Sequence, residues 1–200
     1  SIFINKGVAV NCIGDCVIDA RGVDQRAVAI DASEATLNGF TIPGDESMYA
    51  GVVVAPSSVN ATVSNNTIYG MMLSNPSNDS PLAYGILTWG PSNDNMPVGS
   101  NFIGNDISFI AGSGISLGDN TYNTTISGNN IHDIVPVSIA GQEVSIGVQA
   151  NLSTSLMISD NSFSNLSIAS NLLASTASLS NNSYSGLVGS YLTTTVPNLI

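Results

Sequence analysis

Four of the 14 acidic residues, together with the single histidine, are candidates for acid–base chemistry. Asp106, Asp119, Asp133 and Asp160 occur singly among asparagines and glycines, and His132 precedes Asp133. Glycoside hydrolysis uses two facing carboxylates, and a histidine base acts with a nucleophile or a metal. A carboxylate pair would form here only if the fold stacked separate segments. We therefore interpret the aspartates as turn residues and His132 as a loop or edge residue that hydrogen-bonds to Asp133 or to water, and we expect no catalytic residues and no enzymatic activity.

We also predict no metal and no other cofactor. Residues 93–95 (NDN) and 119–120 (DN) offer oxygen ligands, but neither belongs to a calcium-binding loop pattern. Cys12 and Cys16 are the only cysteines, so a structural zinc site would lack ligands. Their spacing can close a disulfide within the chain. Because so short a loop restricts the unfolded chain little, a disulfide that cross-links two chains is an equal alternative.

Charge excludes several classes of partner. The chain has 200 residues and a net charge of −11, and Lys6, Arg21 and Arg26 are its only cations. Nucleic acid and anionic lipid are bound through Lys and Arg, so neither is an expected partner. No apolar run approaches the roughly 18 residues of a membrane span, so no membrane insertion is expected. Asn occurs 23 times and Ser 30 times, which predicts a neutral polar surface.

A short motif recurs five times, and it predicts the structural elements on which the candidate aspartates and His132 lie. It reads apolar, two small or polar residues, Asn, polar, apolar, at 63–68, 102–107, 126–131, 158–163 and 179–184. The fixed asparagines are Asn66, Asn105, Asn129, Asn161 and Asn182, and a degenerate copy at 37–42 has Phe40 instead. Uneven spacing of a constant motif predicts a solenoid whose coils carry loops of variable length.

The recurring asparagine fits a corner between two short strands. Asn tolerates the left-handed backbone conformation, and stacked copies can hydrogen-bond amide to amide along the solenoid. Ordinary hairpin turns in a β-sandwich are the alternative, but the Asn-Gly and Asp-Gly hairpin signals are missing. A second strand-like segment precedes most copies, at 50–55, 84–89, 113–117 and 145–149. Residues 166–179 show no clear period and are predicted to form an irregular coil.

Residues 17–22 (VIDARG), 27–30 (AVAI) and 36–42 (TLNGFTI), followed by the repeated motif, resemble the right-handed parallel β-helix proteins of the pectate-lyase-like superfamily. The similarity covers about residues 15 to 187 and is greatest to β-helix repeat proteins of archaeal and bacterial cell surfaces. It implies an all-β fold, a single-stranded right-handed solenoid with variable loops. That fold hosts lyases, hydrolases, epimerases, adhesins and structural proteins, so it does not specify an activity.

The resemblance and the chain ends together lead to a functional hypothesis. We expect one domain, residues 1–200, with strand-like, uncapped ends at 1–10 and 187–200. Unpaired strand edges at both ends would let copies of the chain stack into a filament, ring, sheath or surface layer. The expected partner is therefore the chain itself, and the expected role is structural. In composition the chain resembles the sheath and surface-layer material of archaea.

Carbohydrate is the alternative partner. Trp89, Tyr84, Tyr122 and Tyr69 could stack on sugar rings of a carbohydrate-binding or carbohydrate-active module, although Tyr84 and Trp89 are better explained as residues that flank a buried strand. An adhesin or phage-type fibre domain would share the fold.

An extracellular or cell-surface location is compatible with seven Asn-x-Ser/Thr sites for glycosylation, although a chain rich in these residues also generates such triplets by chance. The sites are Asn60, Asn65, Asn78, Asn123, Asn151, Asn165 and Asn181.

Overall fold

Short strands in three parallel sheets make up the fold. A computed structural model of the chain describes residues 1–73, 83–89, 98–139, 141–190 and 192–194. Sheet A contains β1 (Ile2–Ile4), β3 (Arg26–Ile30), β6 (Ala50–Val54), β9 (Ala83–Thr88), β12 (Gly112–Leu117), β17 (Ile146–Asn151), β20 (Ile168–Leu173) and β23 (Leu192–Thr194). Sheet B contains β2 (Ala9–Asn11), β4 (Thr36–Asn38), β7 (Thr62–Ser64), β10 (Asn101–Ile103), β13 (Thr125–Ser127), β18 (Leu156–Ser159) and β21 (Ala177–Ser180). Sheet C contains β5 (Thr41–Pro43), β8 (Thr67–Tyr69), β11 (Asp106–Ser108), β14 (Asn130–His132), β19 (Ser162–Ser164) and β22 (Ser183–Ser185).

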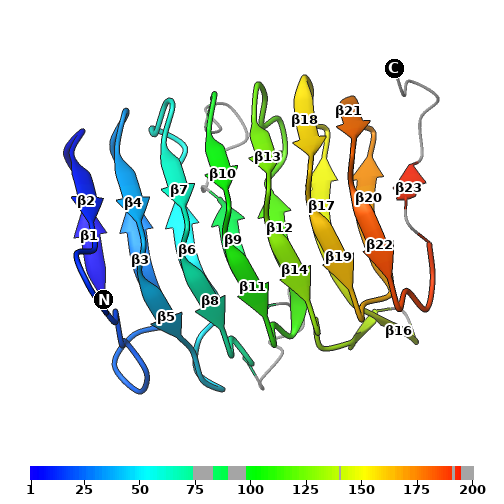
Figure 1. Cartoon of the computed structure of the whole chain (residues 1–200), viewed down its shortest axis with the longest axis horizontal. Coiled ribbons are helices and arrows are strands. Elements are labelled where there is room, and N and C mark those ends of the chain that lie inside the picture. Colours follow the sequence, from blue (N-terminus) through cyan, green and yellow to red (C-terminus); the bar gives the residue numbers. More distant parts are fainter. Residues whose placement is uncertain (74–82, 90–97, 140, 191, 195–200) are drawn as a thin grey trace.

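The chain visits the three sheets in turn, and each circuit adds one coil. Strands of one coil pair with those of the next in the same order, so the coils follow from blue to red along the long axis in Figure 1. The predicted strand-like segments became β6, β9, β12 and β17 of sheet A, and each copy of the motif spans one strand of sheet B and one of sheet C. The predicted solenoid is therefore confirmed. None of the described residues form a helix long and apolar enough to cross a bilayer.

The core consists of side-chain stacks that run from coil to coil. On sheet C the inward stack, fixed by the strand register, is Ile42, Ile68, Ile107, Ile131, Phe163 and Tyr184. On sheet B it is Val10, Leu37, Val63, Phe102, Ile126, Ile158 and Leu179. These stacks contain the two apolar positions of the motif, and burial of the same positions in successive inner coils explains why the motif repeats, although Tyr184 on the outermost strand of sheet C is 38% exposed.

Glycines in sheet A let the sheet C stack approach closely. A Cβ on Gly114 would lie 2.6 Å from Ile131 Cγ2, and one on Gly85 would lie 2.6 Å from Ile107 Cγ2. No side chain fits at these inward positions without displacing the stack. This explains the glycine within the strand-like segments that precede the motif.

The five motif asparagines form a continuous ladder at the corner between sheets B and C. Asn105 donates from its backbone N–H and from Nδ2 to Asn129 Oδ1, at 2.9 and 3.0 Å. The same pattern joins Asn66 to Asn105, Asn129 to Asn161, and Asn161 to Asn182. Nδ2 of each asparagine also donates to a backbone carbonyl of sheet B, such as Phe102 O from Asn129. These bonds satisfy amides that are 99% buried at Asn66, Asn105, Asn129 and Asn161.

The prediction that the motif asparagine itself adopts the left-handed conformation at the corner was wrong by one residue. The residue with positive φ is the one before each ladder asparagine, namely Asn65, Gly104, Gly128, Asp160 and Asn181. In the degenerate copy it is Gly39. The exposed residue before the ladder thus makes the bend, which leaves the following side chain free to turn inward and bond. At Phe40 the ladder ends on the backbone, where the Phe40 N–H donates to Asn66 Oδ1 at 2.9 Å.

Two segments differ from expectation. Residues 166–179, expected to be irregular, contain β20 and the start of β21, in register with β17 and β18. Buried Ala169, Leu172 and Ala177 keep the inward pattern, although Ser170 takes the inward position that pairs with Val148 and so obscures the pattern in the sequence. The sequence also did not predict the antiparallel hairpin of β15 (Val137–Ile139) and β16 (Gln142–Val144).

Cys12 and Cys16 form a disulfide within the chain. It lies at the corner of the first coil, where the Cys12 N–H donates to Asn38 O and the Thr41 N–H donates to Cys16 O, both at 2.9 Å. A Cβ on Gly39 would lie 3.4 Å from Cys12 Cβ. The first coil has no motif asparagine. At the corner where the asparagine ladder would continue, it has the disulfide loop instead.

Candidate functional site

His132 brings two of the candidate aspartates together on the outer face of sheet C. Its Nδ1 lies 2.7 Å from Asp133 Oδ2, and its Nε2 lies 3.0 Å from Asp106 Oδ1 on the neighbouring strand. Asn130 and Asn165 donate to the same two carboxylates, at 2.9 Å each. Burial lowers the pKa of His132, but the hydrogen bonds to both aspartates outweigh it and raise the pKa above its ordinary value. Both ring nitrogens of His132, both oxygens of Asp133 and Oδ1 of Asp106 thus have partners, and we interpret the cluster as a link between coils.

The other aspartates serve turns. Asp160 has positive φ in the turn before Asn161, and Asp119 accepts a hydrogen bond from Asn151 Nδ2 at 2.6 Å. Asn93, Asp94 and Asn95 lie outside the described residues. No group of three or more His, Cys, Asp or Glu that could hold a metal ion occurs in the part of the chain that the structure describes.

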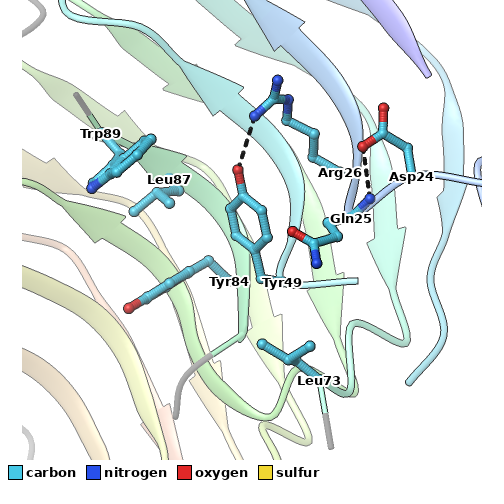
Figure 2. A pocket seen from close by; sticks show the side chains of 8 residues that line it. All are labelled: Asp24, Gln25, Arg26, Tyr49, Leu73, Tyr84, Leu87 and Trp89. Carbon is cyan, nitrogen blue, oxygen red and sulfur yellow. Dashed lines mark hydrogen bonds between the residues drawn. The ribbon is translucent and has the colours of Figure 1, made fainter. Parts of the chain in front are cut away.

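A cleft of about 610 Å³ opens on the outer face of sheet A (Figure 2). Its outward position follows from the strand register, since Leu87 pairs with Val53 while the adjacent Ile86 pairs with Val52 in the core. The cleft crosses β3, β6 and β9, and its lining residues are Asp24, Gln25, Arg26, Tyr49, Leu73, Tyr84, Leu87 and Trp89. We call it the sheet A cleft.

The floor of the sheet A cleft is apolar. Ala50, Val53 and Leu87 form a small buried cluster separate from the main core, and Tyr49 and Tyr84 pack against it. Trp89 is 52% exposed beside them. An exposed tryptophan and two half-buried tyrosines gathered at an apolar cleft are typical of a binding site.

The apolar floor is confined to a few coils. One outward row of sheet A runs Ala29, Val53 and Leu87, and the same row continues as Ser116, Gln149 and Asn171. The row changes from apolar to polar after β9. The cleft therefore depends on residues particular to β3, β6 and β9 and not on the repeated motif.

Polar groups at one end of the cleft are held by neighbours. Arg26 Nη1 donates to Tyr49 Oη at 3.1 Å, which fixes the tyrosine ring across the cleft (Figure 2). This hydrogen bond raises the pKa of Arg26. Asp24 accepts from the Ser1 hydroxyl at 2.6 Å and from the Gln25 N–H at 2.7 Å, and the Ser1 bond lowers the pKa of Asp24.

The structure unites only two of the four aromatic residues singled out in the sequence. Tyr84 and Trp89 line the cleft, and Tyr49, which the sequence analysis missed, lies between Tyr84 and Arg26 (Figure 2). Tyr69 is on β8 of sheet C, and Tyr122 is in the turn between β12 and β13. Tyr49 immediately precedes a strand-like segment, and that position was the available signal.

No protein-family model and no curated protein sequence matches the chain. Among solved structures, the A-module of mannuronan C-5 epimerase AlgE4 from Azotobacter vinelandii is 14% identical, with a TM-score of 0.57 over 98% of this chain and 57% of that chain. The tailspike protein gp49 of Pseudomonas phage LKA1 is 12% identical, with a TM-score of 0.49 over 84% of this chain and 31% of that chain. The surface adhesin PfbA of Streptococcus pneumoniae is 11% identical, with a TM-score of 0.36 over 84% of this chain and 65% of that chain. This chain thus spans less than two thirds of each of these proteins.

Three parallel sheets wound in sequence order are the architecture that the epimerase module shares. The chain is a right-handed parallel β-helix. The fold expected from the resemblance to the pectate-lyase-like superfamily is thereby confirmed. At this level of identity the likeness concerns the fold alone.

On this β-helix, most of the predicted glycosylation sites face solvent. Five of these asparagines are exposed in turns with positive φ, namely Asn60, Asn65, Asn123, Asn165 and Asn181. Asn151 is half-buried, and Asn78 lies outside the described residues. Glycosylation stays a prediction.

Proposed function

We propose that this β-helix is a glycan-binding module of an extracellular or cell-surface protein and that the sheet A cleft is its binding site. The observation that carries the proposal is the grouping of Tyr49, Tyr84 and Trp89 over an apolar floor, with the polar groups of Gln25 and Arg26 beside them. Aromatic faces stack on the C–H faces of sugar rings, and flanking polar groups bond to hydroxyls. The disulfide between Cys12 and Cys16 supports an oxidising, extracellular setting.

Binding without catalysis is the activity we assign to the cleft. Among the described residues that line it, Asp24 is the one carboxylate, and its oxygens accept hydrogen bonds from Ser1 and Gln25. Glycoside hydrolysis with an acid and a base needs two carboxylates on opposite sides of the bond. The fold also occurs in an epimerase module, whereas the cleft has the features of a binding site. An experiment must therefore measure binding and product formation separately.

A panel of immobilised oligosaccharides, probed with the full chain, tests the proposal. The wild type should bind at least one glycan class and release no product from it. Trp89→Ala should weaken that binding about tenfold or more, because it removes an exposed stacking face. Tyr122→Ala is the matched control, since Tyr122 is an exposed aromatic outside the cleft, 44% accessible. Failure of the wild type to bind any glycan, or equal binding by Trp89→Ala, would overturn the proposal.

We propose self-association as a second function, for a separate observation. Within residues 1–200, β1 is an outer strand of sheet A. The first coil exposes Phe3, Ile13 and Val23, with exposed fractions of 59, 97 and 80%. Strand addition at that edge would cover the apolar side chains, as would another coil of a longer polypeptide. Sedimentation velocity distinguishes pairing between two copies of the chain from coverage by a further coil of one longer polypeptide. Oligomers that Phe3→Lys dissociates support self-association, and a monomer at several hundred micromolar would contradict it.

A further inference from the structure

The charge around the sheet A cleft is nearly balanced within a strongly acidic chain. Arg26 is the one cation and Asp24 the one carboxylate among the lining residues described. No Lys or Arg occurs anywhere after Arg26, so β6, β9 and every loop beyond them lack cations by sequence alone. Arg21, the nearest other arginine in the sequence, donates from Nε and Nη2 to Asp19, at 2.8 and 2.6 Å.

The single arginine of the cleft is already engaged. Its Nη1 donates to Tyr49 Oη at 3.1 Å, and its side chain is half-buried at the start of β3. In Figure 2 the guanidinium points to the tyrosine hydroxyl. Arg26 is therefore a positioning residue for the Tyr49 ring.

A chain of uronic acids would meet this cleft unfavourably. Such a polymer carries one carboxylate per sugar, and the cleft crosses three strands, about 10 Å of the solenoid at the usual strand spacing. More than one carboxylate would then face a single cation in the field of a protein with a net charge of −11. Among the described residues, no group of three or more His, Cys, Asp or Glu could hold a metal ion for bridging the protein and such a polymer.

We propose that the sheet A cleft selects neutral polysaccharides over polyuronates. This inference rests on the proposed glycan-binding function and adds the class of ligand. Tyr84 and Trp89 supply uncharged stacking faces, and Leu87 lies between them on the floor. The Gln25 amide and the Tyr49 hydroxyl supply neutral hydrogen-bonding groups to sugar hydroxyls. Discrimination against polyuronates then follows from the scarcity of cations around the cleft and not from any one repulsive contact.

Isothermal titration of the full chain with two series of probes tests the ligand class. Gluco-, manno- and xylo-oligosaccharides form the neutral series, and oligogalacturonate and oligomannuronate form the charged series, each at low and high salt and with or without added calcium. We expect a neutral probe to bind at least about tenfold tighter than any uronate, with little dependence on salt. Arg26→Gln should weaken neutral binding less than Trp89→Ala does, because a glutamine still leaves the stacking faces in place.

The outcomes separate this inference from the proposal on which it rests. A uronate that binds as tightly as the neutral probes, weakens with salt and is lost in Arg26→Gln would overturn the selectivity and leave glycan binding standing. A chain that binds neither series would overturn glycan binding and the selectivity together. Binding of a neutral probe that survives high salt and is lost in Trp89→Ala supports both.

Discussion

Asn105 and Asn129 lie on adjacent coils, and one side-chain oxygen of Asn129 accepts both the backbone N–H and the Nδ2 group of Asn105, at 2.9 and 3.0 Å. Asn129 in turn donates to Phe102 O at 2.9 Å. A single buried amide thus satisfies groups on two coils. Because the unit repeats, removing one asparagine should leave unpaired polar groups on both sides of the gap.

Asn129→Ala should therefore lower the free energy of unfolding by about 2 to 4 kcal/mol, since buried donors and an acceptor lose their partners. Asn130→Ala is the control, because Asn130 is exposed and next in sequence; its cost should stay below about 1 kcal/mol. Urea denaturation measures both. Equal costs for the two variants would show that the ladder contributes little to stability.

Gly114→Ala should destabilise the chain by roughly 1 to 3 kcal/mol, because the added Cβ would lie 2.6 Å from Ile131 Cγ2 and 2.9 Å from Gly147 O. Ser116→Ala on the outer face of the same strand should change stability by less than about 0.5 kcal/mol. Thermal unfolding followed by circular dichroism compares the two variants. If Gly114→Ala melts like the wild type, the close packing of sheet A on the sheet C stack is wrong.

Reduction of the disulfide should cost no more than about 2 kcal/mol, because Cys12 and Cys16 are only four residues apart and the loop that they close is short. The double variant Cys12→Ser, Cys16→Ser should match the reduced wild type in urea denaturation. A mass increase of two hydrogens on reduction checks that the bond is intramolecular. Dissociation of a covalent dimer on reduction would be inconsistent with the pairing observed.

His132 should make stability depend on pH above the ordinary histidine pKa. Its pKa is raised in the folded chain by Asp133 and Asp106, against the effect of burial. The stabilisation is therefore complete below about pH 6.5 and is lost as pH rises through the folded pKa. We expect the melting temperature of the wild type to fall between pH 6 and 9, and that of His132→Gln to fall less. NMR titration of the single histidine gives its pKa directly, and a value below 6.5 would contradict the link between coils.

The sequence predicted the repeating part of the fold well because each coil buries the same positions. Asn66, Asn105, Asn129, Asn161 and Asn182 were all visible as ladder residues, since the same amide at the same position of five successive coils leaves a periodic pattern in the sequence. The bend was misplaced by one residue, because Gly104 or Asp160 and the following asparagine both suit turns. The strands of coil 166–179 were missed, since the buried Ser170 and the neighbouring Asn171 interrupt the apolar pattern of Ala169 and Leu172.

The cleft could be predicted only in part, because it depends on differences between coils. Tyr84 and Trp89 were candidates by type, but Tyr69 and Tyr122 were equal candidates, and strand register alone separates them. Tyr49 joins the cleft through loop lengths that set which residues become neighbours on sheet A. The contact of His132 with Asp106 was likewise invisible, because it joins strands of two coils.

The most direct test of the account uses Trp89, the only tryptophan, which lies in the cleft and is 52% exposed. Its fluorescence reports on the proposed site without a label. On titration of the full chain with a neutral oligosaccharide that binds, the emission should shift to shorter wavelength and saturate with the Kd measured by calorimetry. A glycan that binds by calorimetry while the Trp89 emission stays unchanged would place the site elsewhere and contradict the account.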